Sequence, residues 1–504
     1  MKHALPWPVA NYTPELLHSR LAPSLRPLLR TGMIYSVVIT ILSALTSGCA
    51  IPPHWGMNKA VQIRTADHTL SDPANPLAVR VEADKRLVRL TSVKGDFRLR
   101  ILQRIICTAE NSPRIKIYAL AELAKASPAT ARALLQHRLY HMNHWRVLIF
   151  ACRLAVSMHD AGAVDALFRS LKRPGRRYAI GDRPEASAIR DLTHQTLRAA
   201  LWRRLAAPGN MPARVAALEV LDRIGSAEVV KKGILGIEKP DAFITALAWY
   251  IRQFDYLPRR GTEAAWVEEL YGARKGPLIR KAMANVEGLL RDHLMSAGLA
   301  PRYLALAGQF GKQAQLLPMQ PLYQQVAALL AEHRHIRRPA PYAGAPTDIT
   351  PTLSANQSKL DYWDLLLAKV LLTALARGGF AKHVWQAGDA SRQDRSSEEG
   401  GLIICRGKSL QLQLYDPAMR INNTIYVSSG RLLLDTPRGI AQFIFHFQHV
   451  HNARYTGPAE GDLRYVRHTG CSVVIFTSIG RGKFDTVLDT PSGAVLDLGV
   501  TALH

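Results

Sequence analysis

The sequence predicts a multidomain protein in which an all-α helical-repeat array precedes a mixed α/β domain. Its 504 residues correspond to about three domains at roughly 150 residues each. From about Phe97 the apolar residues recur with the period of amphipathic helices, whereas after Phe380 they follow a strand-like pattern. Hydrophobic residues make up 48% of the chain, which excludes a disordered protein, and five cysteines exclude a disulfide-built scaffold.

The N-terminus has the features of an export signal. Residues 33–46 form a short apolar run that follows several arginines and ends at the small residues before Cys49. The stretch from Leu45 to Cys49 resembles a bacterial lipobox, which implies that Cys49 is lipidated and holds the protein on a membrane. We therefore expect residues 1–48 to be a signal peptide and the protein to be exported and anchored in the cell envelope, at the outer membrane or on the periplasmic side. An uncleaved N-terminal anchor helix is the alternative.

The middle of the chain predicts a helical array over residues 97–335. Residues 49–96 precede it as a linker, with a possible short hairpin at 78–91. The segments that begin at Ser112 and after Met211 each combine a proline, an aliphatic helix, a break and a second helix. This pattern resembles HEAT-type repeats, which implies a solenoid that holds a protein partner.

The charge of the chain is concentrated before the α/β domain. The whole chain carries a formal net charge of +26, whereas residues 360–504 have 15 Lys and Arg against 13 Asp and Glu. The first 359 residues therefore hold a net charge of +24. No compact basic run with interleaved aromatic residues accompanies this excess, so no specific nucleic-acid partner is predicted. No apolar run after residue 50 is long enough for a polytopic membrane protein.

A proline-rich linker is predicted at 336–358, ahead of an α/β domain at 359–504. We expect this linker to be a cleavage site in limited proteolysis, and a fragment that starts near residue 355 to stay folded. A helix is predicted from Lys359 to Arg377, and a short helix between Asp462 and Gly470. The expected strands cover residues 401–415, 423–428, 440–450, 471–478 and 494–500.

Four residues of this domain have the spacing of a catalytic metal site. His449 and His451 are two residues apart on a predicted strand, so both imidazoles can point to one ion. Asp462 lies eleven residues after the second histidine, at a predicted helix start, and supplies a third ligand. Two histidines and one aspartate leave a fourth position for water, as catalytic zinc requires. Glu398 is then placed to act as the general base.

This pattern resembles the JAB/JAMM (MPN-type) metalloprotease family over roughly residues 396–500. The family's Glu-x-x-Gly element falls on Glu398 and Gly401. The resemblance implies a JAMM-like fold, a zinc cofactor, and a peptidase or isopeptidase that acts on a partner held by the helical array. The alternative is a non-catalytic lipoprotein scaffold with a degenerate JAMM-like domain, because Ala459 replaces the family's serine. In a shifted register, His446 and Gln448 replace the histidine pair, and the domain is then a pseudoenzyme.

Overall fold

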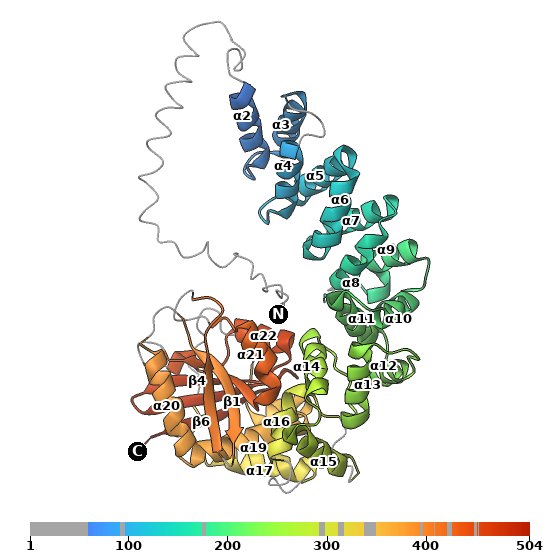
Figure 1. Ribbon diagram of the computed structural model, residues 1–504. Helices are drawn as coiled ribbons and strands as arrows, with labels where there is room; N and C mark the ends of the chain where they lie inside the picture. The colour runs from blue at the N-terminus through green and yellow to red at the C-terminus, as the bar shows by residue number, and fades with distance from the viewer. Residues whose placement is uncertain are drawn as a thin grey trace, which may run out of the picture. The chain divides into compact units, whose positions relative to one another are not determined.

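The computed structural model describes residues 59–90, 96–173, 178–291, 298–310, 317–336, 349–393, 397–407, 409–420, 426–447, 451 and 453–503. The predictions for the signal peptide, for Cys49 and for His449 lie outside these residues. The chain divides into two compact units, Met1–Ala166 and Leu167–His504. The described residues of the first unit are helical, and the second unit begins with helices and ends in a sheet (Figure 1). Among the described residues, no helix has the length and apolar character needed to cross a membrane.

The first unit consists of helices that bury aliphatic side chains against their neighbours in sequence. Fully buried core residues include Leu70, Leu87, Ile101 and Leu120. The helices are α2 (Lys59–Ser71), α3 (Leu77–Leu90), α4 (Asp96–Cys107), α5 (Pro113–Ala126), α6 (Pro128–Arg138) and α7 (Trp145–Ser157).

Helix α3 corrects the possible hairpin at 78–91. Its buried residues, Arg80, Ala83, Asp84 and Leu87, recur at helical spacing. The segment is rich in Ala, Leu, Arg and Glu, which favour helices over strands. Apolar and charged residues alternate in this segment, which suggests a strand. The buried face is nevertheless helical, and it includes the charged residues Arg80 and Asp84. Asp84 is paired with Arg98 of α4 at 2.7 Å, so its charge is compensated.

The second unit continues the helical array. The predicted helix pairs are confirmed by α5 and α6 in the first unit and by α11 and α12 in the second. Each of these four helices has its N-cap at a Ser or Asn, and three of those side chains accept a backbone N–H of the first turn. The helices are α8 (Val164–Leu171, across the division), α9 (Pro184–Thr193), α10 (Leu197–Ala206), α11 (Met211–Ile224), α12 (Ala227–Leu235), α13 (Ala242–Phe254), α14 (Gly261–Gly272), α15 (Pro277–Arg291), α16 (Leu304–Phe310) and α17 (Met319–Ala331).

A six-stranded mixed sheet closes the chain and confirms the predicted α/β domain. The strand order is β2-β1-β3-β4-β5-β6, in which β3 and β4 are parallel and the other neighbours are antiparallel. The strands are β1 (Gly400–Arg406), β2 (Ser409–Tyr415), β3 (Ala441–His446), β4 (Val473–Gly480), β5 (Lys483–Asp489) and β6 (Val495–Ala502). The helices are α18 (Leu353–Asn356), α19 (Tyr362–Ala376), α20 (Gly379–Ser391), α21 (Gly430–Asp435) and α22 (Glu460–Thr469).

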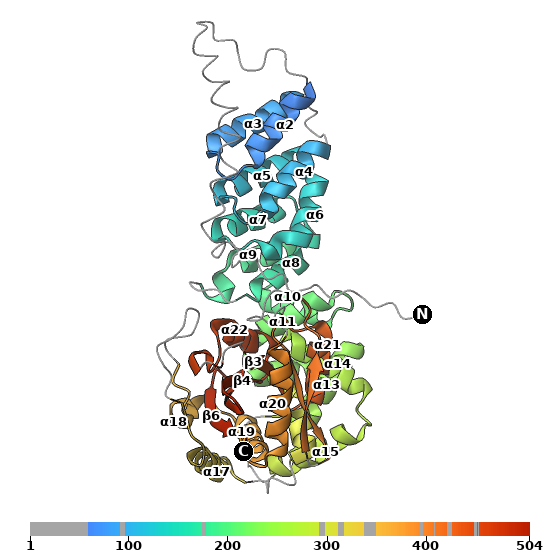
Figure 2. The same ribbon diagram turned by 90° about the vertical axis from the view of Figure 1, so that its left-hand side faces the viewer.

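Helices cover both faces of this sheet (Figure 2). On one face, Val466 of α22 packs against Ile444 of β3 and Ile475 of β4. On the other face, α20 lies against β2, β3 and β4. All six residues of β3 are buried, as expected for a central strand between two helical layers.

The strand predictions needed three changes. The segment 401–415 is a hairpin, β1 and β2, that reverses near Gly407 with its positive φ of 63°. Residues 426–428, the described part of one predicted strand, form no strand. Helix α20 and strand β5 were not predicted.

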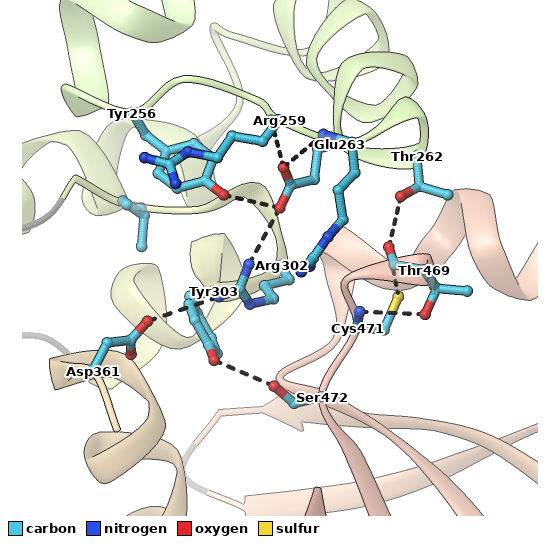
Figure 3. Close-up of polar contacts among 12 residues, drawn as sticks. Tyr256, Arg259, Thr262, Glu263, Arg302, Tyr303, Asp361, Thr469, Cys471 and Ser472 are labelled. Carbon is cyan, nitrogen blue, oxygen red and sulfur yellow. Dashed lines mark hydrogen bonds and ion pairs between the residues drawn. The ribbon is translucent and has the colours of Figure 1, made fainter. Parts of the chain in front are cut away.

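Polar contacts join the helical array to the sheet domain within the second unit (Figure 3). The Thr262 hydroxyl of α14 donates to the Thr469 carbonyl at 2.6 Å, and the Trp266 indole N–H donates to the Leu433 carbonyl at 2.7 Å. Arg302 lies 3.2 Å from Glu263 and 3.7 Å from Asp361, whose side chain caps α19. These contacts link parts of the chain on either side of the predicted linker.

Candidate proton-transfer site

The pairing of β1 with β3 places Glu398 beside His446. Gly400 is the register partner of Ile444, and the Phe445 N–H donates to the Glu399 carbonyl at 3.0 Å. Because antiparallel register continues one residue at a time, Glu398 is opposite His446 and on the same face of the sheet. Both side chains are buried, with 7% and 8% of their surface exposed.

His446 is oriented by contacts at both ring nitrogens. Its Nδ1 lies 3.3 Å from the Tyr455 carbonyl oxygen, to which it donates. Its Nε2 lies 3.7 Å from Oδ2 of Asp462. His446, the last residue of β3, therefore presents its Nε2 atom to the carboxylate of Asp462, which comes from α22.

The start of α22 fixes Asp462. Its Oδ2 accepts the Ala459 N–H at 2.8 Å, so the side chain caps the helix while it faces His446. A carboxylate is also favoured in the first turn of a helix by the helix dipole. The predicted position of Asp462 at a helix start is confirmed, since α22 begins at Glu460.

Burial and mutual charge shift the protonation of this group. The pKa of Glu398 is raised to about 7, because burial raises it, His446 opposes the shift and the Asp462 carboxylate adds to it. Burial alone lowers the pKa of His446, but Glu398, Asp462 and the Tyr455 carbonyl outweigh it and raise that pKa above its ordinary value. Near neutral pH, Glu398 therefore exchanges a proton beside His446, whose charged form its two carboxylate neighbours favour.

His451 has different partners. Its Nδ1 and Nε2 lie 3.1 Å and 3.0 Å from Nη1 of Arg392, its Nδ1 hydrogen-bonds the Ser478 hydroxyl, and its ring stacks on Trp385. Burial and the Arg392 charge lower its pKa. The structure thus brings Glu398 and Asp462 together around His446, while the contacts of His451 lie with side chains of α20 and β4.

The described residues match a zinc site only in part. His446 Nε2 and the Asp462 carboxylate are donors that zinc accepts, and the bond from Nδ1 to a carbonyl is typical of a metal-bound histidine. Catalytic zinc takes three protein ligands. No group of three or more His, Cys, Asp or Glu side chains in the described part of the chain can hold a metal ion.

Two further carboxyls on this face of the sheet are buried. Asp485 and Asp489 of β5 are 2% and 1% exposed. Burial raises the pKa of Asp489 to about 8, Asp462 adds to the shift and Arg467 opposes it. The spacing in the sequence could have located them. Asp485 and Asp489 lie two residues before and two residues after Val487, on the strand face that packs against Leu463 of α22.

Comparison with protein-family models, with characterised proteins and with solved structures gives no match for this chain.

Proposed function

We propose that the protein is an exported, membrane-anchored hydrolase. Its C-terminal JAMM-like domain cleaves a peptide or isopeptide bond in a protein partner that the HEAT-like array holds. Cys49 is the proposed lipid anchor. The observation that carries the proposal is the position of Glu398, a buried carboxyl with a pKa near 7 that faces His446 and Asp462. A general base works best when its pKa is close to the working pH.

The proposed chemistry divides the roles among three side chains. Ionised Glu398 accepts a proton from the water that attacks the scissile carbonyl. Protonated His446, whose Nδ1–H donates to the Tyr455 carbonyl and whose charge Asp462 stabilises, offers that positive charge to the oxygen on which negative charge develops. The proton on Glu398 then passes to the leaving amine. In this account Asp462 orients His446 and stabilises its charged form.

A second candidate function is supported by His451 and Ala459. His451 is engaged by Arg392 and Ser478, and Ala459 stands where the resemblance implies a serine that assists the oxyanion. These features favour a non-catalytic scaffold with a degenerate JAMM-like domain. Hydrolysis distinguishes the two candidates.

The test is hydrolysis by the full chain of a quenched-fluorescent peptide library and of a peptide joined through a lysine isopeptide bond. Each is assayed with added Zn²⁺ and again after treatment with a chelator. We expect Glu398→Gln to lower kcat about 10²- to 10⁴-fold, because the amide cannot accept the proton.

The matched control is Glu399→Gln, one residue away and on the opposite face of the strand. It should leave kcat within about twofold of wild type. Equal loss in both variants would indicate a structural effect. An absence of hydrolysis of either substrate under every metal condition would leave the scaffold as the better account.

A further inference from the structure

The two edges of the sheet differ. At β6, the Val500 N–H donates to the Arg334 carbonyl and the Asp497 N–H donates to the Pro351 carbonyl, each at 2.8 Å. The chain thus covers this edge with segments from before the domain. Strand β2 is the opposite edge, and no described residue pairs with its outer side.

The register identifies the backbone groups at the open edge. The carbonyls of Glu399 and Ile403 in β1 accept hydrogen bonds from β3 or from Ile440 just before it. Because the direction alternates along a strand, even-numbered residues of β1 face β2 and bond to its odd-numbered residues. The N–H and C=O groups of Leu410, Leu412 and Leu414 therefore point away from the sheet.

Strand β2 lacks the features that usually protect an edge. Lysine, proline, a bulge or a covering segment normally prevents edge strands from pairing with other chains. Residues 409–415 read SLQLQLY, without charge and without proline. Leu414 is 50% exposed. Beside the strand, Leu412, Leu414 and α20 residues such as Ala387 line an open groove of about 410 Å³.

We propose that β2 is an interface between two copies of this chain, which pair their β2 strands antiparallel about a two-fold axis at Leu412. The sequence from Leu410 to Leu414 reads the same in both directions, so a two-fold strand pair sets leucine against leucine and glutamine against glutamine. Leu412 then faces Leu412 of the second copy, and Leu410 faces Leu414. These are the residues with outward backbone groups, so each pair exchanges both of its hydrogen bonds.

The side chains suit the same register. On the α20 side of the sheet, the leucines of the two copies form one apolar row, and Leu414 becomes covered. On the other side, Gln411 faces Gln413 of the second copy, and their amides can hydrogen-bond each other.

The charge distribution also favours a second copy. The strand is uncharged, and residues 360–504 carry a net charge of only +2 within a chain of +26. Pairing through β2 therefore joins the nearly neutral parts of two strongly basic chains. An extended peptide from another protein would use the same backbone groups but would not require a palindromic strand.

Site-directed cross-linking tests the axis directly. In the full chain carrying Leu412→Cys, a short bis-maleimide should join two chains, because the two thiols lie opposite each other. Leu434→Cys, at an exposed leucine of α21 with 41% exposure, is the control and should give no more dimer than wild type. The native cysteines set the background in all three proteins. Equal cross-linking at both positions would overturn the proposed axis.

Sedimentation equilibrium of the full chain in detergent gives a second measurement. Leu412→Lys places two like charges opposite each other, and should raise the dimer dissociation constant about tenfold or more. Val229→Lys changes an apolar residue of α12 that is 50% exposed, and should leave the constant unchanged. A monomeric wild-type chain would overturn the proposal. This outcome includes the case in which the β2 edge binds only peptides from another protein. A dimer unaffected by Leu412→Lys would overturn the proposal as well.

Discussion

Asp489 shows how burial converts an ordinary carboxyl into a pH-dependent one. Its Oδ2 is buried and has no hydrogen-bond partner among the described residues, and its pKa is raised to about 8. Between about pH 4 and pH 8 the folded chain therefore keeps a proton that the unfolded chain releases. The free energy of unfolding must fall as pH rises through this window.

The substitution Asp489→Asn should remove this fall in the free energy of unfolding between about pH 4 and pH 8. The amide imitates the protonated acid, so the variant should match wild type near pH 4 and exceed its free energy of unfolding by about 2 kcal/mol or more at pH 8. Denaturant unfolding at both pH values measures the difference, with Asp416→Asn, an exposed carboxyl, as the control. A variant that is less stable than wild type at pH 8 would contradict the burial argument.

At the residue scale, the sequence located Glu398 and Asp462, and offered His446 only as the alternative in a shifted register with Gln448. The spacing of His449 and His451 predicts a shared face only if β3 extends through both, and β3 ends at His446. The strand continued in the prediction because Phe447 and Val450 remain apolar. Where a buried strand ends depends on which residues find hydrogen-bond partners, and local hydrophobicity does not determine this.

The β1–β2 hairpin depends on a close approach of the two backbones at Gly401. A Cβ added at Gly401 would lie 2.0 Å from the Gln413 carbonyl oxygen in β2. No side chain fits there, so the hairpin needs glycine at the position that follows Glu398 by three residues. The glycine of the Glu-x-x-Gly element is therefore explained by packing, because it lets β2 pair closely with β1 beside the site at Glu398.

Gly401→Ala should therefore open the hairpin. We expect the free energy of unfolding to fall by about 2 kcal/mol or more, because backbone atoms must move apart. Gly430→Ala, where a Cβ meets nothing within 4 Å, should be close to neutral. Thermal unfolding of both variants provides the comparison, and similar melting temperatures would show that the β1–β2 contact is looser than described.

Predictions of elements succeeded where the apolar pattern was unambiguous. The helix predicted from Lys359 to Arg377 is confirmed by α19, whose aliphatic residues are buried over much of its surface. Strand β5 was missed because KFDTVLD carries two aspartates. Both are buried in the folded chain, whereas aspartate is mostly exposed in proteins, so the segment does not resemble a buried strand.

At the scale of the whole molecule, buried polar contacts connect the helical array to the sheet. The Tyr303 hydroxyl donates to Asp364. Arg302 pairs with Glu263 and lies near Asp361 (Figure 3). Burial and the neighbouring Asp361 raise the pKa of Asp364 to about 7. A fragment without Arg302 and Tyr303 would take the guanidinium charge from Asp361 and the phenol hydrogen bond from the buried Asp364.

We therefore expect a fragment of residues 355–504 to unfold without a cooperative transition, and residues 167–504 to unfold cooperatively. This reverses the expectation from the sequence, which could not reveal hydrogen bonds between segments far apart in the chain. Circular dichroism during denaturation measures both. Cooperative unfolding of the shorter fragment would restore the linker at 336–358 as a true domain boundary.

Anchoring is a separate prediction at this scale. Cys49→Ala should leave the protein unprocessed or soluble if Cys49 carries the lipid. Membrane fractionation and gel mobility in cells measure this. Unchanged partitioning and unchanged mobility would exclude lipidation at Cys49.

The most direct test of the proposed site is an infrared titration of the Glu398 carboxyl in the full chain. The difference between the spectra of wild type and Glu398→Gln isolates this one group from Asp364 and Asp489, which also titrate near neutral pH. We predict a carboxyl that loses its proton with a midpoint near pH 7. A midpoint at the ordinary value of a solvated glutamate, below about pH 5, would contradict a buried proton-transfer site at Glu398, His446 and Asp462.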